Sequence, residues 1–360
     1  MNTKYKILVV NPGATSTKIA VYSEENPLLE KNIPHPVSAL LAFELAIEQY
    51  DYRLSLVRES LREAHVDPNS LDAIVGRGGL LKPLASGAYL INAKMVEDLI
   101  ERPVADHASN LGAVIAYNLA KELKIPAYIV DPVVVDEFED IARFSGHPSI
   151  ERTSRLHALN MKAVGRRVAS RLGKTYKDMT FIIVHLGSGF SITVHHRGRM
   201  IDSTNAMDDG PFSVERSGDL PVTQLVKFCY QHFAEGKSVG HVQKLLTSES
   251  GVFGYLKTKD LKEVERRAHD GESLAKTVLN ALSYQVAKAV GAMATVVHGR
   301  VDKIVITGGA AHSEHITSAI RERIGYISHV IIEPGEEELL AMAEGALRIL
   351  RGEEPPKDYS

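Results

Sequence analysis

Residues 6–22 read KILVVNPGATSTKIAVY, and a related stretch, FIIVHLGSGFSITVHHRGR, occupies residues 181–199. Each stretch begins with an apolar strand, breaks at a turn rich in Gly, Ser and Thr, and continues as a second apolar strand. A third apolar strand starts at Lys303 and ends in Gly308 and Gly309, before a helix. Such turns expose backbone N–H groups and hydroxyls in a small concavity that suits phosphate oxygens. The pattern predicts a nucleotide held between two related halves.

The length of the chain also predicts two domains, because single cores stop growing at roughly 250–300 residues and this chain has 360. We expect one domain over residues 1–154 and a second over residues 155–336. Hydrophobic periodicity predicts strands at 7–11, 17–22, 73–76 and 127–131 in the first half. It predicts helices at 39–49, 52–65, 109–123, 155–172, 273–298 and 336–350. Ser109 is the expected N-cap of one helix, and Cys229 is expected in a buried helical face.

Composition excludes several classes of function. The formal net charge of −3 argues against a protein that binds nucleic acid through phosphate neutralisation. The single cysteine, Cys229, excludes an internal disulfide and argues against a structural zinc site. The N-terminus lacks the pattern of a signal peptide, and the apolar stretch 287–298 is too short and too mixed to span a bilayer. We therefore expect a cytoplasmic protein with no membrane or nucleic-acid partner.

The glycine turns match neither common nucleotide motif. GxxxxGK[ST] and GxGxxG are both absent, and the first turn leads into a strand instead of a helix, unlike a dinucleotide-binding unit. Each turn alone is also typical of a tight hairpin. Polar groups nevertheless crowd both turns, which a hairpin does not require. They are Asn11, Thr15, Ser16, Thr17 and Lys18 in the first turn, and His185, Ser188 and Ser191 in the second.

These residues resemble the motifs of the acetate and butyrate kinase family, within the actin-like ATPase superfamily. VVNPGATSTK resembles its first phosphate motif, HLGSGFSITVHHRGRMID its second, and GPFSVERSGDLP its arginine-bearing segment. VGRGGLLKP, DHASNLG and EEEL are also similar. The resemblance covers nearly the whole chain and fits the butyrate branch better than the acetate branch. It implies an α/β, two-domain actin-like ATPase fold (a duplicated ribonuclease-H-like fold) with an active-site cleft between the domains, and a last helix, about 337–360, that packs back on the first domain.

The resemblance further implies transfer of a phosphoryl group between ATP and a short-chain fatty acid such as butyrate, with Mg²⁺ bound. A butyrate carboxylate is ionised at neutral pH, so no general base is needed to create the nucleophile. Positioning and neutralisation of the moving phosphoryl group remain as the tasks of the protein. The implied catalytic residues are Arg216, His157, His107 and Asp131, and the implied metal-side acids are Asp131 and Glu337, with Glu336 and Glu338 as neighbouring alternatives.

The same resemblance assigns binding residues for ATP and the fatty acid. Asn11, Thr15, Ser16, Lys18, His185, Gly187, Ser188, Gly189, Gly308 and Gly309 are expected to bind ATP or ADP. The acetate branch has HRVVHGG where this chain has AIVGRGG, so Ile74 stands in place of the substrate-binding arginine. Arg77 is then the cation expected to bind the carboxylate, and Pro211 and Phe212 are expected beside the acyl chain.

Each residue also has a purely structural interpretation. Arg216 could pair with Glu215 or Asp219 at the surface, and His157, His107 and His185 could be helix-face, turn and core histidines. Asp131 could form a turn before Pro132, Lys18 could point to solvent, and Gly308 and Gly309 could form a strand-to-helix turn. The acids of 336–338 could favour the start of a helix through its dipole.

Other activities fit the same fold. An acetate or propionate kinase differs only in the acyl pocket, where one methylene changes selectivity by about 10–200-fold. A sugar kinase of the superfamily needs a base to deprotonate a hydroxyl. A nucleotide-dependent scaffold would hydrolyse ATP slowly. The resemblance also implies a homodimer or larger homo-oligomer.

Overall fold

The computed structural model describes residues 4–360, and the chain in it divides into two compact units. Unit 1 comprises residues 1–136, 158–163 and 337–360, and unit 2 comprises residues 137–157 and 164–336. The division differs from the predicted boundary at residue 154, because residues 137–157 belong to unit 2 and the start of the next helix to unit 1. The chain therefore passes between the units four times, at 136, 157, 163 and 336.

Unit 1 is built on a mixed six-stranded sheet with the order β3-β2-β1-β4-β6-β5. β1 pairs antiparallel with β2, and β2 with β3, whereas β4 and β6 continue the sheet in parallel. The short β5 pairs antiparallel with β6 at the edge. The strands are β1 (Lys6–Pro12), β2 (Ser16–Ser23), β3 (Asn26–Pro34), β4 (Ala73–Gly76), β5 (Ala88–Leu90) and β6 (Ala127–Val130).

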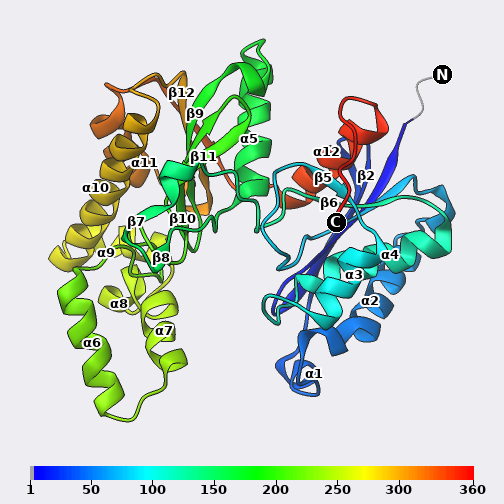
Figure 1. Cartoon of the computed structure of the whole chain (residues 1–360), viewed down its shortest axis with the longest axis horizontal. Coiled ribbons are helices and arrows are strands. Elements are labelled where there is room, and N and C mark those ends of the chain that lie inside the picture. Colours follow the sequence, from blue (N-terminus) through cyan, green and yellow to red (C-terminus); the bar gives the residue numbers. More distant parts are fainter. Residues whose placement is uncertain (1–3) are drawn as a thin grey trace. The chain divides into compact units, whose positions relative to one another are not determined.

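Both faces of this sheet are buried, which explains the continuous apolar runs in β1 and β4. Leu8 and Val10 face a core formed with α2, α3 and α4, which lie together in Figure 1. Ile7 and Val9 face the opposite core, which α12 and the start of α5 complete. The helices are α1 (Val37–Leu40), α2 (Tyr50–Glu63), α3 (Ala93–Glu101), α4 (Asn110–Leu123), α5 (Ala158–Arg171) and α12 (Glu338–Leu350).

Unit 2 repeats the strand pattern of unit 1. Its sheet has the order β11-β10-β9-β12-β13, with two antiparallel pairings followed by two parallel ones. This order matches β3-β2-β1-β4-β6, so the two glycine-turn stretches occupy equivalent hairpins. The strands are β9 (Thr180–Leu186), β10 (Phe190–His196), β11 (Arg199–Ser203), β12 (Lys303–Gly308) and β13 (Val330–Pro334), and a separate small hairpin is formed by β7 (Phe144–His147) and β8 (Ile150–Glu151).

Helices cover one face of this sheet, and α10 is central to them. Its buried stripe, which includes Leu282, Val286 and Val290, packs in one core with β9, β10 and β12. Besides residues 164–171 of α5, the helices of unit 2 are α6 (Val222–Ala234), α7 (Val239–Ser248), α8 (Gly251–Leu256), α9 (Leu261–His269), α10 (Ser273–Val296) and α11 (Glu314–Ile324). Across residues 4–360 no helix combines the length and the apolar character needed to cross a bilayer.

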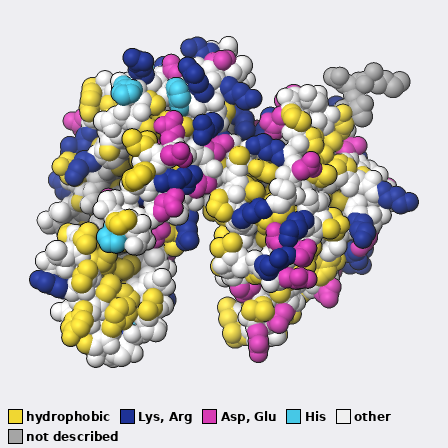
Figure 2. All heavy atoms as spheres, viewed as in Figure 1, with side chains coloured by type: hydrophobic (Ala, Val, Ile, Leu, Met, Phe, Trp, Pro, Cys, Tyr) yellow, Lys and Arg dark blue, Asp and Glu magenta, His cyan; other side chains and the backbone are white. Residues whose placement is uncertain are grey.

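Two local predictions are wrong. The helix expected at 39–49 is broken into α1 and a 3-10 turn at Ala46–Gln49, because Leu41 and Leu45 stay exposed and give a continuous helix nothing to pack against. Cys229 is only partly buried, since α6 contains no buried residue. Figure 2 shows apolar side chains gathered over α6, where Val222, Val226 and Tyr230 are each more than 60% exposed (73%, 63% and 74%).

The close approach of α4 to β4 depends on glycine. A Cβ on Gly112 would lie 2.6 Å from the backbone N and O of Arg77, so Gly112→Ala must push the helix off the strand. We expect it to lower the free energy of unfolding by about 1–3 kcal/mol, measured by chemical denaturation. The matched control is Gly291→Ala in α10, which meets no atom within 4 Å and should stabilise by about 0.5–1 kcal/mol. Equal stability of Gly112→Ala and the wild type would contradict this account of the packing.

Candidate active site

The first glycine turn borders a cavity of about 370 Å³ in unit 1. Asn11 and Lys18 are directly opposite each other on β1 and β2, so both side chains leave the same face of the hairpin. The cavity brings together five of the predicted residues, but Thr15 does not line it. Its lining residues are Asn11, Pro12, Gly13, Ser16, Lys18, Arg77, Leu80, His107, Ser109, Val133 and Glu338.

Glu338, at the start of α12, is the carboxylate of this cavity. Its Oε1 lies 2.7 Å from Nη1 of Arg77, and its Oε2 accepts a hydrogen bond of 3.0 Å from Nδ2 of Asn11. Burial alone would raise the pKa of Glu338, but Arg77 and Asn11 together hold it below its usual value. Glu338 rather than the predicted Glu337 therefore faces the cavity, since Glu337 is the N-cap residue of α12.

His107 combines a turn role with a place in the cavity wall. Its Nδ1 accepts a hydrogen bond of 3.1 Å from the backbone N of Ser109 and lies 2.8 Å from Oγ of the same residue. Ser109 occupies the N-cap position of α4 without making the predicted side-chain cap, because His107 engages its hydroxyl. Burial, and then the charge of Arg77, lower the pKa of His107, so the ring is neutral at pH 7.

Asp131 follows β6 and is 2% exposed. Its Oδ1 accepts a hydrogen bond of 2.7 Å from N of Gly87, and its own N–H donates to O of Gly87 over 3.0 Å. These two hydrogen bonds join the end of β6 to Gly87, 44 residues earlier in the chain, and Asp131 has a left-handed conformation with φ of 37°. Among the residues that the structure describes, no group of three or more His, Cys, Asp or Glu side chains is arranged to hold a metal ion.

In unit 2, two histidines flank the second glycine turn. The rings of His157 and His185 stack with centroids 3.9 Å apart and an angle of 14° between their planes. Nδ1 of His157 lies 3.0 Å from Oγ of Ser191 on the neighbouring strand β10. His185 is 1% exposed, and its Nε2 lies 3.1 Å from Oε1 of Glu336. The predicted pair therefore lies together at the carboxyl end of β9.

Arg216 lies directly against the second glycine turn. A Cβ on Gly189 would be 2.0 Å from Nη1 of Arg216 and 2.6 Å from its Cζ, so the guanidinium fills the space that a side chain would need. Nη1 donates a hydrogen bond of 2.6 Å to the carbonyl O of Ala206. Nε is buried without a partner within residues 4–360, and burial lowers the pKa of Arg216.

Neither of the acids proposed as surface partners of Arg216 pairs with it. Glu215 forms an ion pair with Lys259, and Oδ1 of Asp219 accepts a hydrogen bond of 3.0 Å from N of Gly210. Within residues 4–360, no carboxylate lies within 4.0 Å of the Arg216 guanidinium. The guanidinium is therefore oriented by the carbonyl of Ala206 and not by an acid within residues 4–360.

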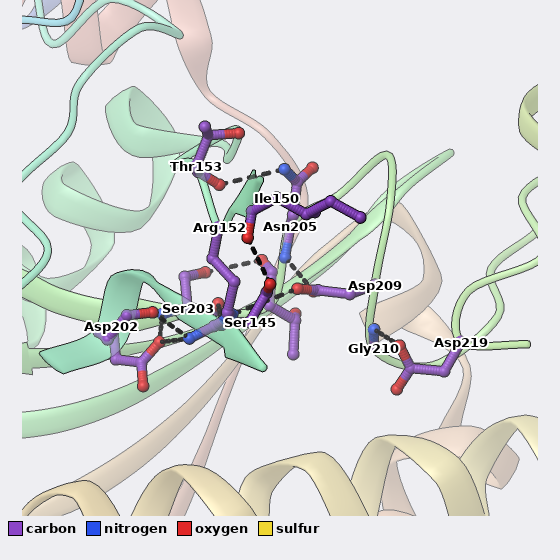
Figure 3. Close-up of polar contacts among 12 residues, drawn as sticks. Ser145, Ile150, Arg152, Thr153, Asp202, Ser203, Asn205, Asp209, Gly210 and Asp219 are labelled. Atoms are coloured by element: carbon purple, nitrogen blue, oxygen red, sulfur yellow. Dashed lines mark hydrogen bonds and ion pairs between the residues drawn. The ribbon is translucent and has the colours of Figure 1, made fainter. Parts of the chain in front are cut away.

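The loop that carries Ala206 is held by an arginine network (Figure 3). Arg152 lies 2.9 Å from Oδ1 of Asp202 and 3.7 Å from Oδ2 of Asp209. Oδ1 of Asp209 accepts a hydrogen bond of 2.5 Å from N of Asn205, whose Nδ2 donates to O of Thr153 over 3.1 Å. These contacts fix residues 205–209 and so the carbonyl that orients Arg216.

The remaining predicted residues of unit 2 lie near this loop and at the end of β12. Phe212 is 7% exposed and part of the core of unit 2, and its N donates to Oε1 of Gln285 over 3.1 Å. Ser188 is joined to the same segment, because its carbonyl O accepts a hydrogen bond of 2.7 Å from Oγ of Ser213. Gly308 has φ of 92°, and a Cβ there would lie 2.6 Å from the backbone of Leu186. Gly309 has open space around it.

Comparison with known proteins identifies the family of this chain. Residues 150–333 match the Acetokinase family. Butyrate kinase 1 of Clostridium acetobutylicum is 46% identical over 356 residues, which are 99% of each chain. A probable butyrate kinase of Listeria monocytogenes is 45% identical over 357 residues, again 99% of each chain. The chain belongs to the acetokinase family.

Solved structures of the acetokinase family have the same fold. An acetate kinase of Porphyromonas gingivalis superimposes with a TM-score of 0.76 at 19% identity, covering 96% of this chain and all of the other (100%). A propionate kinase of Francisella tularensis gives 0.73 at 21% identity, covering 95% and 98%. The predicted α/β, two-domain actin-like fold class is confirmed.

The residues that support these sites were not predicted from the sequence. Arg152 is distant in sequence from Asp209 and Arg216, and no local pattern links it to them. Arg53 lies beneath the first glycine turn, and its sequence signal was available. The helical period that buries Val57 and Leu61 also places Arg53 on the buried face of α2.

Asp209 provides a test of the arginine network through pH. Burial raises the pKa of Asp209 to about 6, despite the opposing contacts with Asn205 and Arg152. Because the folded pKa lies above the ordinary value of 3.8, the folded state holds a proton that the unfolded state releases. Stability is therefore lost as pH rises from about 4 through about 6.

We expect Asp209→Asn to abolish this loss. Between about pH 5 and about pH 7.5, the free energy of unfolding of Asp209→Asn relative to the wild type should rise by about 1–2 kcal/mol. Scanning calorimetry measures the change, and Asp208→Asn, at the exposed neighbouring position, should leave most of the wild-type pH dependence in place. If the difference in free energy of unfolding between Asp209→Asn and the wild type did not change with pH, the carboxylate of Asp209 would not be destabilised by burial.

Proposed function

We propose that this chain is a butyrate kinase, which transfers the γ-phosphoryl group of ATP to the carboxylate of butyrate and yields butanoyl phosphate and ADP. Relatives named butyrate kinase that match 99% of the chain at 45–46% identity support the substrate class. The structural observation that carries the proposal is the contact of Arg216 with Gly189, where a Cβ would be 2.0 Å from Nη1. A guanidinium with free donors beside a phosphate-binding turn suits a phosphoryl group in transfer.

In unit 2, Arg216 neutralises the transferred phosphoryl group and can contact two of its oxygens at once. The ring of His157 stacks on that of His185 with centroids 3.9 Å apart, and His157 supports Arg216 beside the phosphoryl group. Gly187, Ser188 and Gly189 supply backbone N–H groups to the nucleotide phosphates. Gly308 and Gly309 allow the backbone to approach the adenosine closely.

In unit 1, Asn11, Ser16 and Lys18 bind phosphoryl oxygens with Thr15 at the tip of the turn. Arg77 binds the carboxylate, and its ion pair of 2.7 Å with Glu338 holds its guanidinium in the wall of the cavity. His107 is neutral because of burial; since its Nδ1 accepts from the N–H of Ser109, its Nε2 carries the hydrogen and donates there. The contact of Pro211 and Phe212, in unit 2, with the acyl chain stays a prediction, and Phe212 itself packs in the core of unit 2.

Mg²⁺ fits the acids of unit 1 only in the manner usual for kinases, in which one or two carboxylates hold a hydrated ion together with substrate phosphates. Asp131, which does not line the cavity, would hold it through water, and Glu338, in place of Glu337, is the acid on the cavity wall. When bound, Mg²⁺ neutralises charge on the ATP phosphates.

The cavity also favours a carboxylate acceptor over a sugar. A sugar hydroxyl needs a general base, and Glu338 is the carboxylate among the lining residues. Its contacts with Arg77 and Asn11 lower its pKa, which makes it a weak base. An already ionised acceptor needs no such group. Acetate and propionate stay as alternative acceptors, because one methylene changes selectivity only about 10–200-fold.

We also propose a homodimer or larger homo-oligomer, supported by the exposed apolar side chains of α6. The cytoplasmic location stays a prediction. Neither statement affects the assignment of the reaction.

Substitution of Arg216 tests the reaction directly. We expect Arg216→Ala to lower kcat with butyrate and ATP by about 10³-fold or more, because the charge on the phosphoryl group is left without its guanidinium. The acyl phosphate is trapped with hydroxylamine and measured as the hydroxamate, across acids of two to five carbons. Arg266→Ala, an exposed arginine on α9 that pairs with Asp270, is the control. Wild-type kcat in Arg216→Ala would refute the role, and turnover of sugars but not fatty acids would refute the proposed reaction.

Gly189→Ala tests the position of Arg216 without removing its charge. The added methyl must displace the guanidinium, from which it would be only 2.0 Å away. We expect kcat to fall about 10²-fold with KM for butyrate little changed, and the thermal midpoint to stay near that of the wild type. The control is Gly309→Ala, which has no atom within 4 Å of the new methyl and whose effect should be confined to KM for ATP. An unchanged kcat in Gly189→Ala would contradict the proposed link between the turn and Arg216.

A further inference from the structure

Arg53 is a fully buried cation in unit 1 with no acidic partner. Its exposed fraction is 0%, and within residues 4–360 no carboxylate lies within 4.0 Å of its guanidinium. One neutral partner is Oε1 of Gln49, the N-cap residue of α2, which accepts hydrogen bonds of 2.9 Å from Nε and 2.7 Å from Nη2. A buried charge normally requires an opposite charge, because neutral hydrogen bonds replace only part of its hydration.

The guanidinium lies beneath the first glycine turn. Nη1 donates to the carbonyl O of Ser16 over 3.2 Å and to Oγ1 of Thr17 over 2.9 Å, and Nη2 lies 3.5 Å from the carbonyl O of Ala14. The carbonyl O of Ser16 also accepts the N–H of Gly13 over 2.7 Å, which closes the turn. Gly13 and Ser16 line the cavity, which lies on the side of the turn opposite Arg53. The cation is therefore about one peptide group behind the wall of the proposed phosphate site.

His35 is a second buried side chain that supports the turn, and it adds no charge. Nε2 of His35 lies 2.9 Å from Oγ1 of Thr17, and its Nδ1 lies 3.2 Å from the hydroxyl of Tyr52. Burial, and then the charge of Arg53, lower the pKa of His35 to about 4, so the ring is neutral at pH 7. Since Thr17 Oγ1 accepts from Arg53, its own hydrogen can be donated to Nε2 of His35. Arg53 is thus the charged member of the group.

We propose that Arg53 is the buried counter-charge for the phosphoryl group bound at the first glycine turn, a role in which the bound anion supplies the negative charge that the protein omits. The turn both transmits the field of the cation and keeps the guanidinium out of contact with the reactants. Arg53 is therefore a positioning and electrostatic residue and not a catalytic one. The inference rests on the proposed function, because it requires the phosphates of ATP or ADP to bind at this turn.

The alternative is that Arg53 only clamps the turn mechanically. The two roles differ in what they require of the side chain. A counter-charge needs the positive charge and tolerates loss of the planar fork, whereas a clamp needs the fork that spans Ala14, Ser16, Thr17 and Gln49. Arg53→Lys keeps the charge and loses the fork, while Arg53→Gln loses both. The comparison of these two variants separates the roles.

The experiment is calorimetric titration of the full chain with adenosine, AMP and ADP. We expect Arg53→Gln to weaken ADP about ten- to a hundredfold and adenosine less than twofold, with AMP between them. Arg53→Lys should stay within about threefold of the wild type for all three ligands. Arg58→Gln makes the same charge change on the exposed face of α2, where Arg58 pairs with Glu122, and should leave every affinity unchanged.

Equal weakening of ADP by Arg53→Lys and Arg53→Gln would overturn the counter-charge and leave the clamp, as would a loss that does not grow with the number of phosphates. If Arg53→Gln fails to fold, Arg53→Met keeps the volume of the stem and replaces it as the neutral variant. Failure of the proposed function has a different signature, since the wild type would then bind neither ADP nor ATP and form no hydroxamate. Tight ADP binding by the wild type together with unweakened binding by the neutral variant would overturn the inference alone.

Discussion

Each glycine turn of this chain lies against an arginine that has no carboxylate within 4.0 Å among residues 4–360. In unit 2 the guanidinium of Arg216 occupies the space of a missing side chain at Gly189. In unit 1 the guanidinium of Arg53 lies behind the turn and binds its carbonyl groups. A positive charge kept from water and from acids is costly in the free protein. Under the proposed function, that cost is offset when a phosphoryl group binds, and the surrounding contacts hold the two guanidinium groups beside the turns.

The packing around the two turns holds Arg216 and Arg53 in these positions. In unit 2, Arg152 binds both Asp202 and the loop of Asn205 and Asp209, and the loop presents the carbonyl of Ala206 to Arg216. In unit 1, α2 carries Arg53 on the same face as Val57 and Leu61, so packing of the helix on the sheet fixes the guanidinium. The interior of a protein is close-packed, and the guanidinium groups therefore have little freedom to move away from the turns.

The other ionisable groups near the first turn also have defined charges. Glu338 is held by Arg77 and Asn11 and stays ionised, and His107 and His35 are kept neutral by burial and by nearby arginines. The protein thus limits the charges near the first turn to a few defined groups. Phosphoryl transfer to a carboxylate needs electrostatic order more than proton transfer. This physical requirement explains why the cavity has strong cations and no effective base.

The sequence alone determined the two related hairpins, the strands at 73–76, 127–131 and from Lys303, and the family, because apolar runs and glycine turns are local patterns that depend on neighbouring residues. β4 was predicted at its observed bounds, and β1, β2 and α4 to within one residue. Only the tertiary structure decided which acid of 336–338 faces the cavity, that Arg216 fills the space at Gly189, and that Arg53 lies under the first turn. These facts depend on the direction in which a helix enters and on packing between segments distant in sequence. A one-residue shift turns a helical side chain by about 100°, and no local pattern fixes that rotation.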